Sequence, residues 1–441
     1  MEPEDIFGEA TSSNSVPLLV NGRGRRSSSA AMTGALVFST FVALLGSFVF
    51  GSSVGFSSPA QSGIRKDLGL SLAEYSFFGS ISTIGALVGA VVSGKVADMF
   101  GRRGAMGITG LFNIFGWLAI VFSKFNAPKF PSLSVGTGFL EFLSCLVPVY
   151  IAEITPKNLR GAFTAGNQLM ICIGSSTMYL VGNIITWRLL ALTGIFPCVI
   201  QLLGLPFIPE SPRWLAKNGQ WDDSKSSLLL LRGKRANILE EAAEIRDYTV
   251  TLEQSKESRI MELFQRKYAH SLLIGVGLMV LQQFGGVNAI GYYASSIFVS
   301  AGFSERVGTT AMVIIKVPMT VLGVLLMDKS GRHPLLLVSA GGTCLESSPF
   351  LSLGGVLIFT GSFSLGVGGI PWVIMSEIFP INVKGIAGSL VAVVSWFGSW
   401  VITYSFNFLA QWSFAGDPLH PFGLRFLTNS VDMSTNFQPI W

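Results

Sequence analysis

The segment Glu153-Ile-Thr-Pro-Lys-Asn-Leu-Arg-Gly161 recurs in the second half of the chain as Glu377-Ile-Phe-Pro-Ile-Asn-Val-Lys-Gly385. A second pair matches in the same order, since Asp98-Met-Phe-Gly-Arg-Arg103 recurs as Asp328-Lys-Ser-Gly-Arg-His333. Ordered self-similarity of this kind indicates a duplicated structural unit. The sequence therefore predicts two pseudo-symmetric halves that carry the same charged segments at the ends of their helices.

Long apolar runs surround these charged segments and indicate a chain embedded in lipid. Of the 441 residues, 50% are hydrophobic and only 12% are charged, whereas a soluble domain carries about 25% charge. About 20 apolar residues in a helix cross the roughly 30 Å hydrocarbon core with every backbone hydrogen bond satisfied. We therefore expect an all-α membrane protein. The predicted spans cover residues 35–56, 75–94, 104–123, 131–152, 161–186, 189–208, 271–300, 307–327, 354–375 and 386–410.

The polar segments divide the chain into domains. Residues 1–34 are predicted to form a disordered cytosolic tail, and residues 35–208 a bundle of six helices. A helical cytosolic linker follows at residues 209–270, then an incomplete second bundle at 271–410 and an atypical tail at 411–441. Lys and Arg are concentrated in the first tail, the linker and the charged repeats, and by the positive-inside rule this places the N-terminus in the cytosol.

Several function classes find no support in the sequence. The four cysteines lie inside apolar segments without a metal-binding spacing, and the three histidines are scattered. Neither a nucleophile–base pairing nor a phosphate-binding loop is present, so we predict no enzyme activity, no cofactor and no metal site. The net charge of +5 comes from the loops. We therefore expect the chain to lie in a lipid bilayer and not to bind nucleic acid.

The repeated charges are expected to act together on the cytosolic side. Carboxylates and arginines lie close in sequence there, and ion pairs between helices would favour a closed cytosolic side. The alternative is that these charges only fix the topology. The predicted network comprises Asp98, Arg102, Arg103, Glu153, Arg160, Asp328, Arg332, Glu377 and Lys384.

Three motifs resemble those of a known family. The sequence resembles the sugar porter family of the major facilitator superfamily at Gly94-Lys-Val-Ala-Asp-Met-Phe-Gly-Arg-Arg103, Pro209-Glu-Ser-Pro-Arg-Trp214 and Gln282-Gln-Phe-Gly-Gly-Val-Asn288. Residues 147–161 and 369–388 are similar to the plant early-responsive-to-dehydration-like monosaccharide transporters. The resemblance implies the major facilitator fold, in which two helical bundles share a central site.

The resemblance also implies that a hexose binds midway across the membrane. The side chains that it assigns to the sugar are Gln168, Gln282, Gln283, Asn288, Trp372 and Asn407, with Tyr292 and Tyr293 as an outer lid. Amides offer donors and an acceptor to sugar hydroxyl groups, and a Trp ring offers an apolar face. The alternative for each amide is a hydrogen bond to a neighbouring helix, and for Trp372 it is a packing role.

The sequence departs from the family pattern at four places. The fourth span has Gly136-Thr-Gly138 in place of a Gly-Arg pair, with Glu141 inside it, and Lys316 replaces an amide in the eighth span. A lone cation at mid-bilayer costs at least about 2.5–3.5 kcal/mol, so Lys316 is expected to face a cavity, Glu141 or water. The ninth span is shortened to residues 334–345, and the twelfth span is missing.

We therefore predict transport of a monosaccharide, such as glucose or fructose, by alternating access. The first span has no carboxylate, which favours facilitated diffusion, with protons as coupling partner in the alternative. A second hypothesis is a non-transporting sugar sensor or a defective truncated isoform, because the twelfth span is missing. Leu18-Leu19 resembles a vacuolar sorting signal, so the vacuolar membrane is favoured over the plasma membrane.

Overall fold

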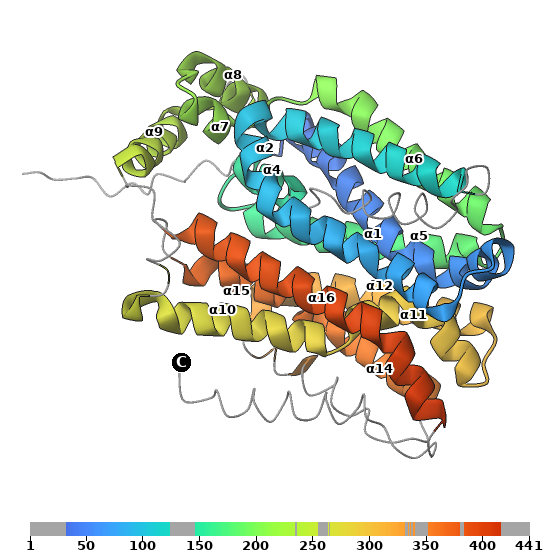
Figure 1. Ribbon diagram of the computed structural model, residues 1–441. Helices are drawn as coiled ribbons and strands as arrows, with labels where there is room; N and C mark the ends of the chain where they lie inside the picture. The colour runs from blue at the N-terminus through green and yellow to red at the C-terminus, as the bar shows by residue number, and fades with distance from the viewer. Residues whose placement is uncertain are drawn as a thin grey trace, which may run out of the picture.

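The described part of the computed structural model is built from helices joined by short turns (Figure 1). It comprises residues 32–123, 146–233, 236–254, 263, 265–330, 334, 336, 338–339, 352–379 and 383–415. The first half contains α1 (Gly34–Leu68), α2 (Leu72–Val121), α4 (Leu146–Ile154), α5 (Arg160–Gly182), α6 (Trp187–Gly204) and the 3-10 turn η1 (Leu205–Phe207). The linker contains α7 (Pro212–Lys217), α8 (Trp221–Arg232) and α9 (Leu239–Gln254). The second half contains α10 (Arg266–Phe284), α11 (Val287–Ser300), α12 (Glu305–Ser330), α14 (Ser352–Ser362), the π-helical turn η3 (Phe363–Val367), α15 (Ile370–Ile378) and α16 (Lys384–Ala415).

The two halves form two helical bundles that lie side by side (Figure 1). Helices α7–α9 pack against one end of the first bundle, where they contact α1, α2 and α4. We call this the linker end of the molecule and the opposite end the far end. The bundles contact each other mainly through α2 with α16, α5 with α12, and α1 with α11.

Many of these helices have the length and composition of membrane spans. Within the described residues, seven helical segments are long and apolar enough to cross a membrane, so the chain is a multi-pass membrane protein. Helix α5 is not among them, because its polar residues, which include Asn167 and Gln168, lower its hydropathy. The seven segments are Gly34–Leu68, Leu72–Val121, Trp187–Phe207, Arg266–Ser300, Glu305–Leu326, Gly354–Met375 and Ile386–Phe408.

The range labelled α2 comprises two of the predicted spans, which meet at a kink. Helix α2 changes direction at Gly101, which has φ 76° and ψ 170°, so that residues 75–94 and 104–123 lie on either side of a break. Glycine is required there because an L side chain rarely adopts a positive φ, and because a Cβ would also overlap the Glu210 carboxylate. The predicted boundary between the two spans thus coincides with a kink at which one helical segment ends and the next begins.

Several predicted features lie outside the described residues. They are the Gly136-Thr-Gly138 segment and Glu141 of the fourth span, most of the shortened ninth span, the atypical tail beyond Ala415, and the N-terminal tail with Leu18-Leu19. At the boundary of the second bundle, α16 continues past residue 410 to Ala415.

Close packing of α1 against α5 depends on glycine. A Cβ added at Gly174 would overlap the carbonyl oxygen of Phe48, and one added at Gly51 would overlap that of Ile171. Small residues at such crossings let two helix backbones approach closely within a membrane. The extensive packing of α1 on α5 therefore holds together the core of the first bundle.

We expect Gly174→Ala to destabilise the protein by about 1–3 kcal/mol, the usual cost of overpacking a tight contact. A fall in melting temperature in detergent would measure this change. The matched control is Gly94→Ala, because Gly94 is exposed on α2 and a Cβ there meets nothing within 4 Å. A helical glycine without such a contact gains stability from alanine, so equal losses in both variants would contradict the prediction.

Candidate functional site

The predicted amides meet where α10 gives way to α11. Gln282 and Gln283 lie in the last turn of α10, and Gly286 has a left-handed φ of 76° before α11 begins at Val287. This φ favours glycine, which has no Cβ. The break brings Asn288 back toward α10, where its Nδ2 donates a hydrogen bond to Gln283 Oε1 at 2.7 Å.

Two serines of α16 complete this group of hydrogen bonds. Ser395 Oγ accepts from Gln283 Nε2 at 2.9 Å, and Ser399 Oγ accepts from Asn288 Nδ2 at 2.7 Å. The serines are one turn apart, so they lie on the same face of the helix. We call Gln282, Gln283, Asn288, Ser395 and Ser399 the amide cluster. Neither serine was predicted from the sequence; their one-turn spacing within an apolar helix is the signal that could have indicated them.

Gln282 has an unused acceptor. Its Nε2 donates to the carbonyl oxygens of Val367 at 2.8 Å and Gly368 at 3.1 Å, where η3 ends. Its Oε1 is buried and has no hydrogen-bond partner among the described residues. An unsatisfied buried acceptor costs about 1–3 kcal/mol, so this oxygen is suited to accept a hydrogen bond from a ligand hydroxyl group.

A tryptophan of α16 lies between the two bundles. Trp396 is adjacent to Ser395 and packs edge-on against Phe50 of α1, with 5.9 Å between ring centroids and an interplanar angle of 85°. Its Nε1 is buried without a partner in the part of the chain that the structure describes. Trp396 was not predicted from the sequence, although it combines an apolar face with a free donor. The predicted Trp372 is partly buried and packs on the core of the second bundle.

Two predicted amides lie apart from this cluster. Gln168 lies on α5 in the other half, partly buried and without a hydrogen-bond partner among the described residues. Asn407 Nδ2 donates to Ser76 Oγ of α2 at 2.9 Å. Asn407 lies about 12 Å along α16 from Ser399, at 1.5 Å per residue, so the structure does not bring it to the amide cluster.

The predicted lid residues are buried at the far end, where Tyr292 contacts the first half and Tyr293 packs on α16 of its own half. Tyr292 and Ser82 of α2 share a hydrogen bond of 2.8 Å between their hydroxyl oxygens. Tyr293 stacks on Phe406 with 5.5 Å between ring centroids, and its OH donates to the Thr403 carbonyl at 3.2 Å. These contacts close the far end between α2, α11 and α16.

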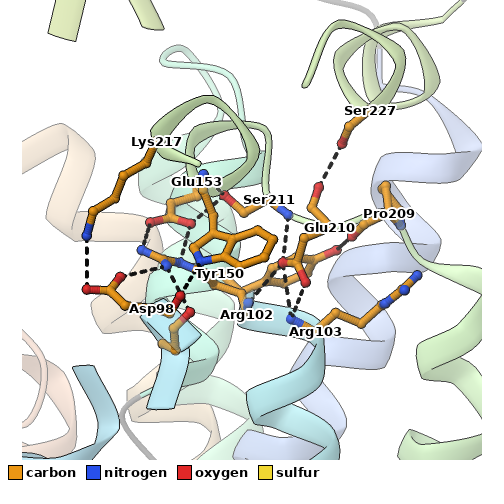
Figure 2. Close-up of polar contacts among 12 residues, drawn as sticks. Asp98, Arg102, Arg103, Tyr150, Glu153, Pro209, Glu210, Ser211, Lys217 and Ser227 are labelled. Atoms are coloured by element: carbon orange, nitrogen blue, oxygen red, sulfur yellow. Dashed lines mark hydrogen bonds and ion pairs between the residues drawn. The ribbon is translucent and has the colours of Figure 1, made fainter. Parts of the chain in front are cut away.

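Five predicted network charges are described, and four of them meet at the linker end (Figure 2). The Arg102 guanidinium donates two hydrogen bonds to the Glu153 carboxylate, both at 2.9 Å, and one to Asp98 at 3.2 Å. Lys217 of α7 also pairs with Asp98 at 2.9 Å. The side chains of Arg102 and Glu153 are 13% and 15% exposed, whereas those of Lys217 and Asp98 are about half exposed. The strong pair is therefore the bidentate, mostly buried one.

The linker supplies carboxylate and hydroxyl partners that were not predicted. Glu210 accepts from the backbone N–H groups of Arg102 at 2.9 Å and Arg103 at 3.1 Å, where α2 restarts after its break. A carboxylate is favoured at such a helix start because the N–H groups there point toward it. Burial nevertheless raises the pKa of the Glu210 carboxyl above its ordinary value, against the effect of these N–H groups. Ser211 Oγ donates to Glu153.

Arg160 does not join this group. Its Nε is buried without a partner among the described residues, and burial together with nearby Arg213 lowers the pKa of its guanidinium. The predicted charges of the second half cannot be compared, because Arg332 and the side chains of Asp328, Glu377 and Lys384 lie outside the described part of the chain.

Comparison with known proteins identifies the family of this chain. The family model described as "Sugar (and other) transporter" matches residues 39–416. The chain belongs to the sugar transporter family. One curated relative is Sugar transporter ERD6-like 16 of Arabidopsis thaliana, which is 54% identical over 404 residues. The alignment covers 86% of this chain and 83% of that protein. Sugar transporter ERD6-like 7 of the same plant is 51% identical and covers 86% of each chain.

Solved structures confirm the major facilitator fold for this sugar transporter family member. The major facilitator superfamily proton:xylose symporter XylE, bound to 6-bromo-6-deoxy-D-glucose, superposes with a TM-score of 0.79 at 23% identity and covers 91% of this chain and 95% of its own. An inward open structure of XylE from E. coli gives a TM-score of 0.73, covering 90% of this chain and 95% of its own. The predicted fold of two related helical bundles is thus confirmed.

Proposed function

We propose that this protein carries a monosaccharide, such as glucose or fructose, across a membrane by alternating access. The observation that carries the proposal is the amide cluster, in which Gln282 retains a buried acceptor beside several satisfied amide groups. Family membership supports the same function. The sugar would bind between the amide cluster, Trp396 and the facing helices α1 and α5, with Gln168 as a contribution from the first half.

The proposed carrier is closed at the far end in this structure. The contacts of Tyr292, Tyr293 and Asn407 join α2 to α11 and α16 there. At the linker end, the ion pairs of Arg102 lie within the first half, and Lys217 of the linker pairs with Asp98. We propose that the linker end faces the cytosol, that Tyr292 and Tyr293 form the lid, and that Arg160 gains a partner from the second half when the linker end closes.

Facilitated diffusion is the mode that the described charges favour. Between its predicted span limits, residues 35–56, α1 carries no carboxylate that could take up a proton beside the sugar. Proton coupling is the alternative. Uptake of labelled glucose into proteoliposomes against its gradient, abolished by a protonophore, would contradict facilitated diffusion.

We further propose the vacuolar membrane as the site of action, with the plasma membrane as the alternative. A fluorescent fusion of the full chain would distinguish the two membranes.

Replacing Gln283 by alanine is expected to weaken glucose binding about tenfold, the effect of losing one or two hydrogen bonds. The variant removes the side chain that joins Ser395 to Asn288. Equilibrium binding of labelled glucose to the purified full chain measures the change. The matched control is Gln201→Ala, because Gln201 is also buried, 2% exposed against 7% for Gln283, but lies on α6. Unchanged affinity in a normally inserted Gln283→Ala variant would remove Gln283 from the site.

A further inference from the structure

A basic side chain lies inside the membrane between the two bundles. Lys316 is on α12 in the second half, and its Nζ donates to Ser175 Oγ of α5 in the first half at 2.8 Å. The Nζ also lies 5.9 Å from the centre of the Tyr179 ring. An ionisable group at this depth is costly, so it usually marks a functional site.

Lys316 lies on the protein-facing side of α12. One turn before it, Met312 is 2% exposed, and one turn after it, Thr320 is 3% exposed. The opposite side of α12 carries Ile314 and Leu325, which are 65% and 61% exposed. Lys316 itself is only partly buried. Because its neighbours on the same face are covered, Lys316 lies on the side of α12 that packs against other helices rather than on the exposed side.

No described carboxylate can neutralise this lysine. The elements packed on α12 are α5, α11, α14 and η3, and the only charged residue among them is Arg160, at the linker end of α5. The acidic residues of α12 itself, Glu305 and Asp328, are about 17 Å away along the helix at 1.5 Å per residue. A lysine ammonium has three donors, and within the described residues one hydrogen bond is formed.

Lys316 is at the depth of the proposed sugar site. On α5, Gln168, Cys172 and Ser175 recur at helical spacing along one face, and Cys172 contacts Thr320, one turn from Lys316. On α1, one short segment contacts both α5 and α16. Its Phe48 lies against Gly174, next to Ser175, and its Phe50 lies against Trp396 of α16. The part of α5 that binds Lys316 and the part of α16 that carries Trp396 therefore contact the same segment of α1.

We infer that Lys316 gives the central site a preference for a monosaccharide that carries a carboxylate, such as a hexuronate. This inference rests on the proposed sugar-binding function. The carboxylate would accept hydrogen bonds from the unused donors of Lys316, since the Ser175 hydroxyl already donates to the Cys172 carbonyl at 3.0 Å, while the sugar hydroxyl groups would bind the amide cluster. An anion removes the cost of an unpaired cation in the membrane, and charge-assisted hydrogen bonds are about twice as strong as neutral ones.

The experiment measures displacement of labelled D-glucose from the purified full chain by D-glucuronate, by the uncharged D-glucuronamide, and by unlabelled D-glucose. We expect glucuronate to bind about tenfold more tightly than glucuronamide in the wild type, the gain from one charge-assisted hydrogen bond. Lys316→Gln is expected to abolish this preference, and Lys316→Arg to retain part of it. Acetate is the control for an anion that is not a sugar.

The outcomes separate the inference from the proposed function. If the wild type and Lys316→Gln bind glucose alike and neither distinguishes glucuronate from glucuronamide, the inference is wrong and sugar binding stands. If acetate displaces glucose as well as glucuronate does, a sugar acid is not the ligand and the inference fails. If correctly folded wild type and Lys316→Gln bind none of the sugars, the proposed function fails and the inference fails with it.

Discussion

Glucose uptake is expected to fall to background when Ser58 and Ser295 are both replaced by cysteine and oxidised, and to return when the disulfide is reduced. The two hydroxyl oxygens are 2.9 Å apart, and Ser58 Oγ also accepts from the Ser295 backbone N–H at 2.8 Å. Ser58 is on α1 and Ser295 is on α11, so the disulfide would join the two halves at the far end.

The size of this effect follows from alternating access. The far end can admit or release sugar only if α1 and α11 separate, and a covalent bond prevents a rocking motion that noncovalent contacts allow. Residues whose hydroxyl groups touch have Cβ atoms close to the roughly 3.5–4.5 Å that a disulfide needs. Uptake into proteoliposomes, measured with oxidant and then with reductant, gives the result.

Two controls isolate the cross-link. The single variants Ser58→Cys and Ser295→Cys should keep uptake under the same oxidant, which tests any reaction of the native cysteines. A second disulfide can be placed within the first half, because Ser47 Oγ donates to Asn167 Oδ1 between α1 and α5. Oxidised Ser47→Cys/Asn167→Cys protein should still transport sugar. Uptake that persists in the fully cross-linked Ser58→Cys/Ser295→Cys protein would exclude opening at the far end.

The helices could be predicted from the sequence because lipid imposes a strict pattern. A charge-free run of about 20 residues must form a helix in lipid, because only then are its backbone hydrogen bonds satisfied. In the described residues, these runs correspond to helices. What the pattern could not indicate is how spans join. Gly101 joins two predicted spans directly through a kink, and Glu210, which is distant in sequence, accepts a backbone hydrogen bond at the start of the second segment.

Part of the amide cluster could be predicted from the sequence, because three of its residues are close together in the chain. Gln282, Gln283 and Asn288 lie within one short motif, so a local pattern was enough to group them. Their partners, Ser395 and Ser399, are on another helix, and serine is so common in membrane helices that the type alone carries little information. Asn407 is a stronger signal by type, yet it lies with Ser76 at the far end, because position along α16 rather than residue type decides what it contacts.

A large effect is also expected from a single substitution in the Arg102–Glu153 ion pair. Arg102→Gln is expected to lower the free energy of unfolding by about 3 kcal/mol, because removing one partner leaves a mostly buried carboxylate unpaired. Arg102 also donates to the Ala97 carbonyl at 3.2 Å across the break at Gly101, so the variant loses a contact that holds α2 in its bent form. Thermal unfolding of the purified protein in detergent measures the loss.

A neighbouring ion pair of the same network supplies the control. Lys217 pairs with Asp98 at 2.9 Å, but both side chains are about half exposed, and exposed pairs contribute only about 0–1 kcal/mol. Lys217→Gln should therefore change the melting temperature little. The double variant Arg102→Gln/Glu153→Gln should be more stable than Arg102→Gln alone, because it removes the unpaired charge. If Lys217→Gln and Arg102→Gln were equally destabilised, or the double variant were no better, burial of the Glu153 charge would not be the cause. The network would then act only through its total charge at the linker end.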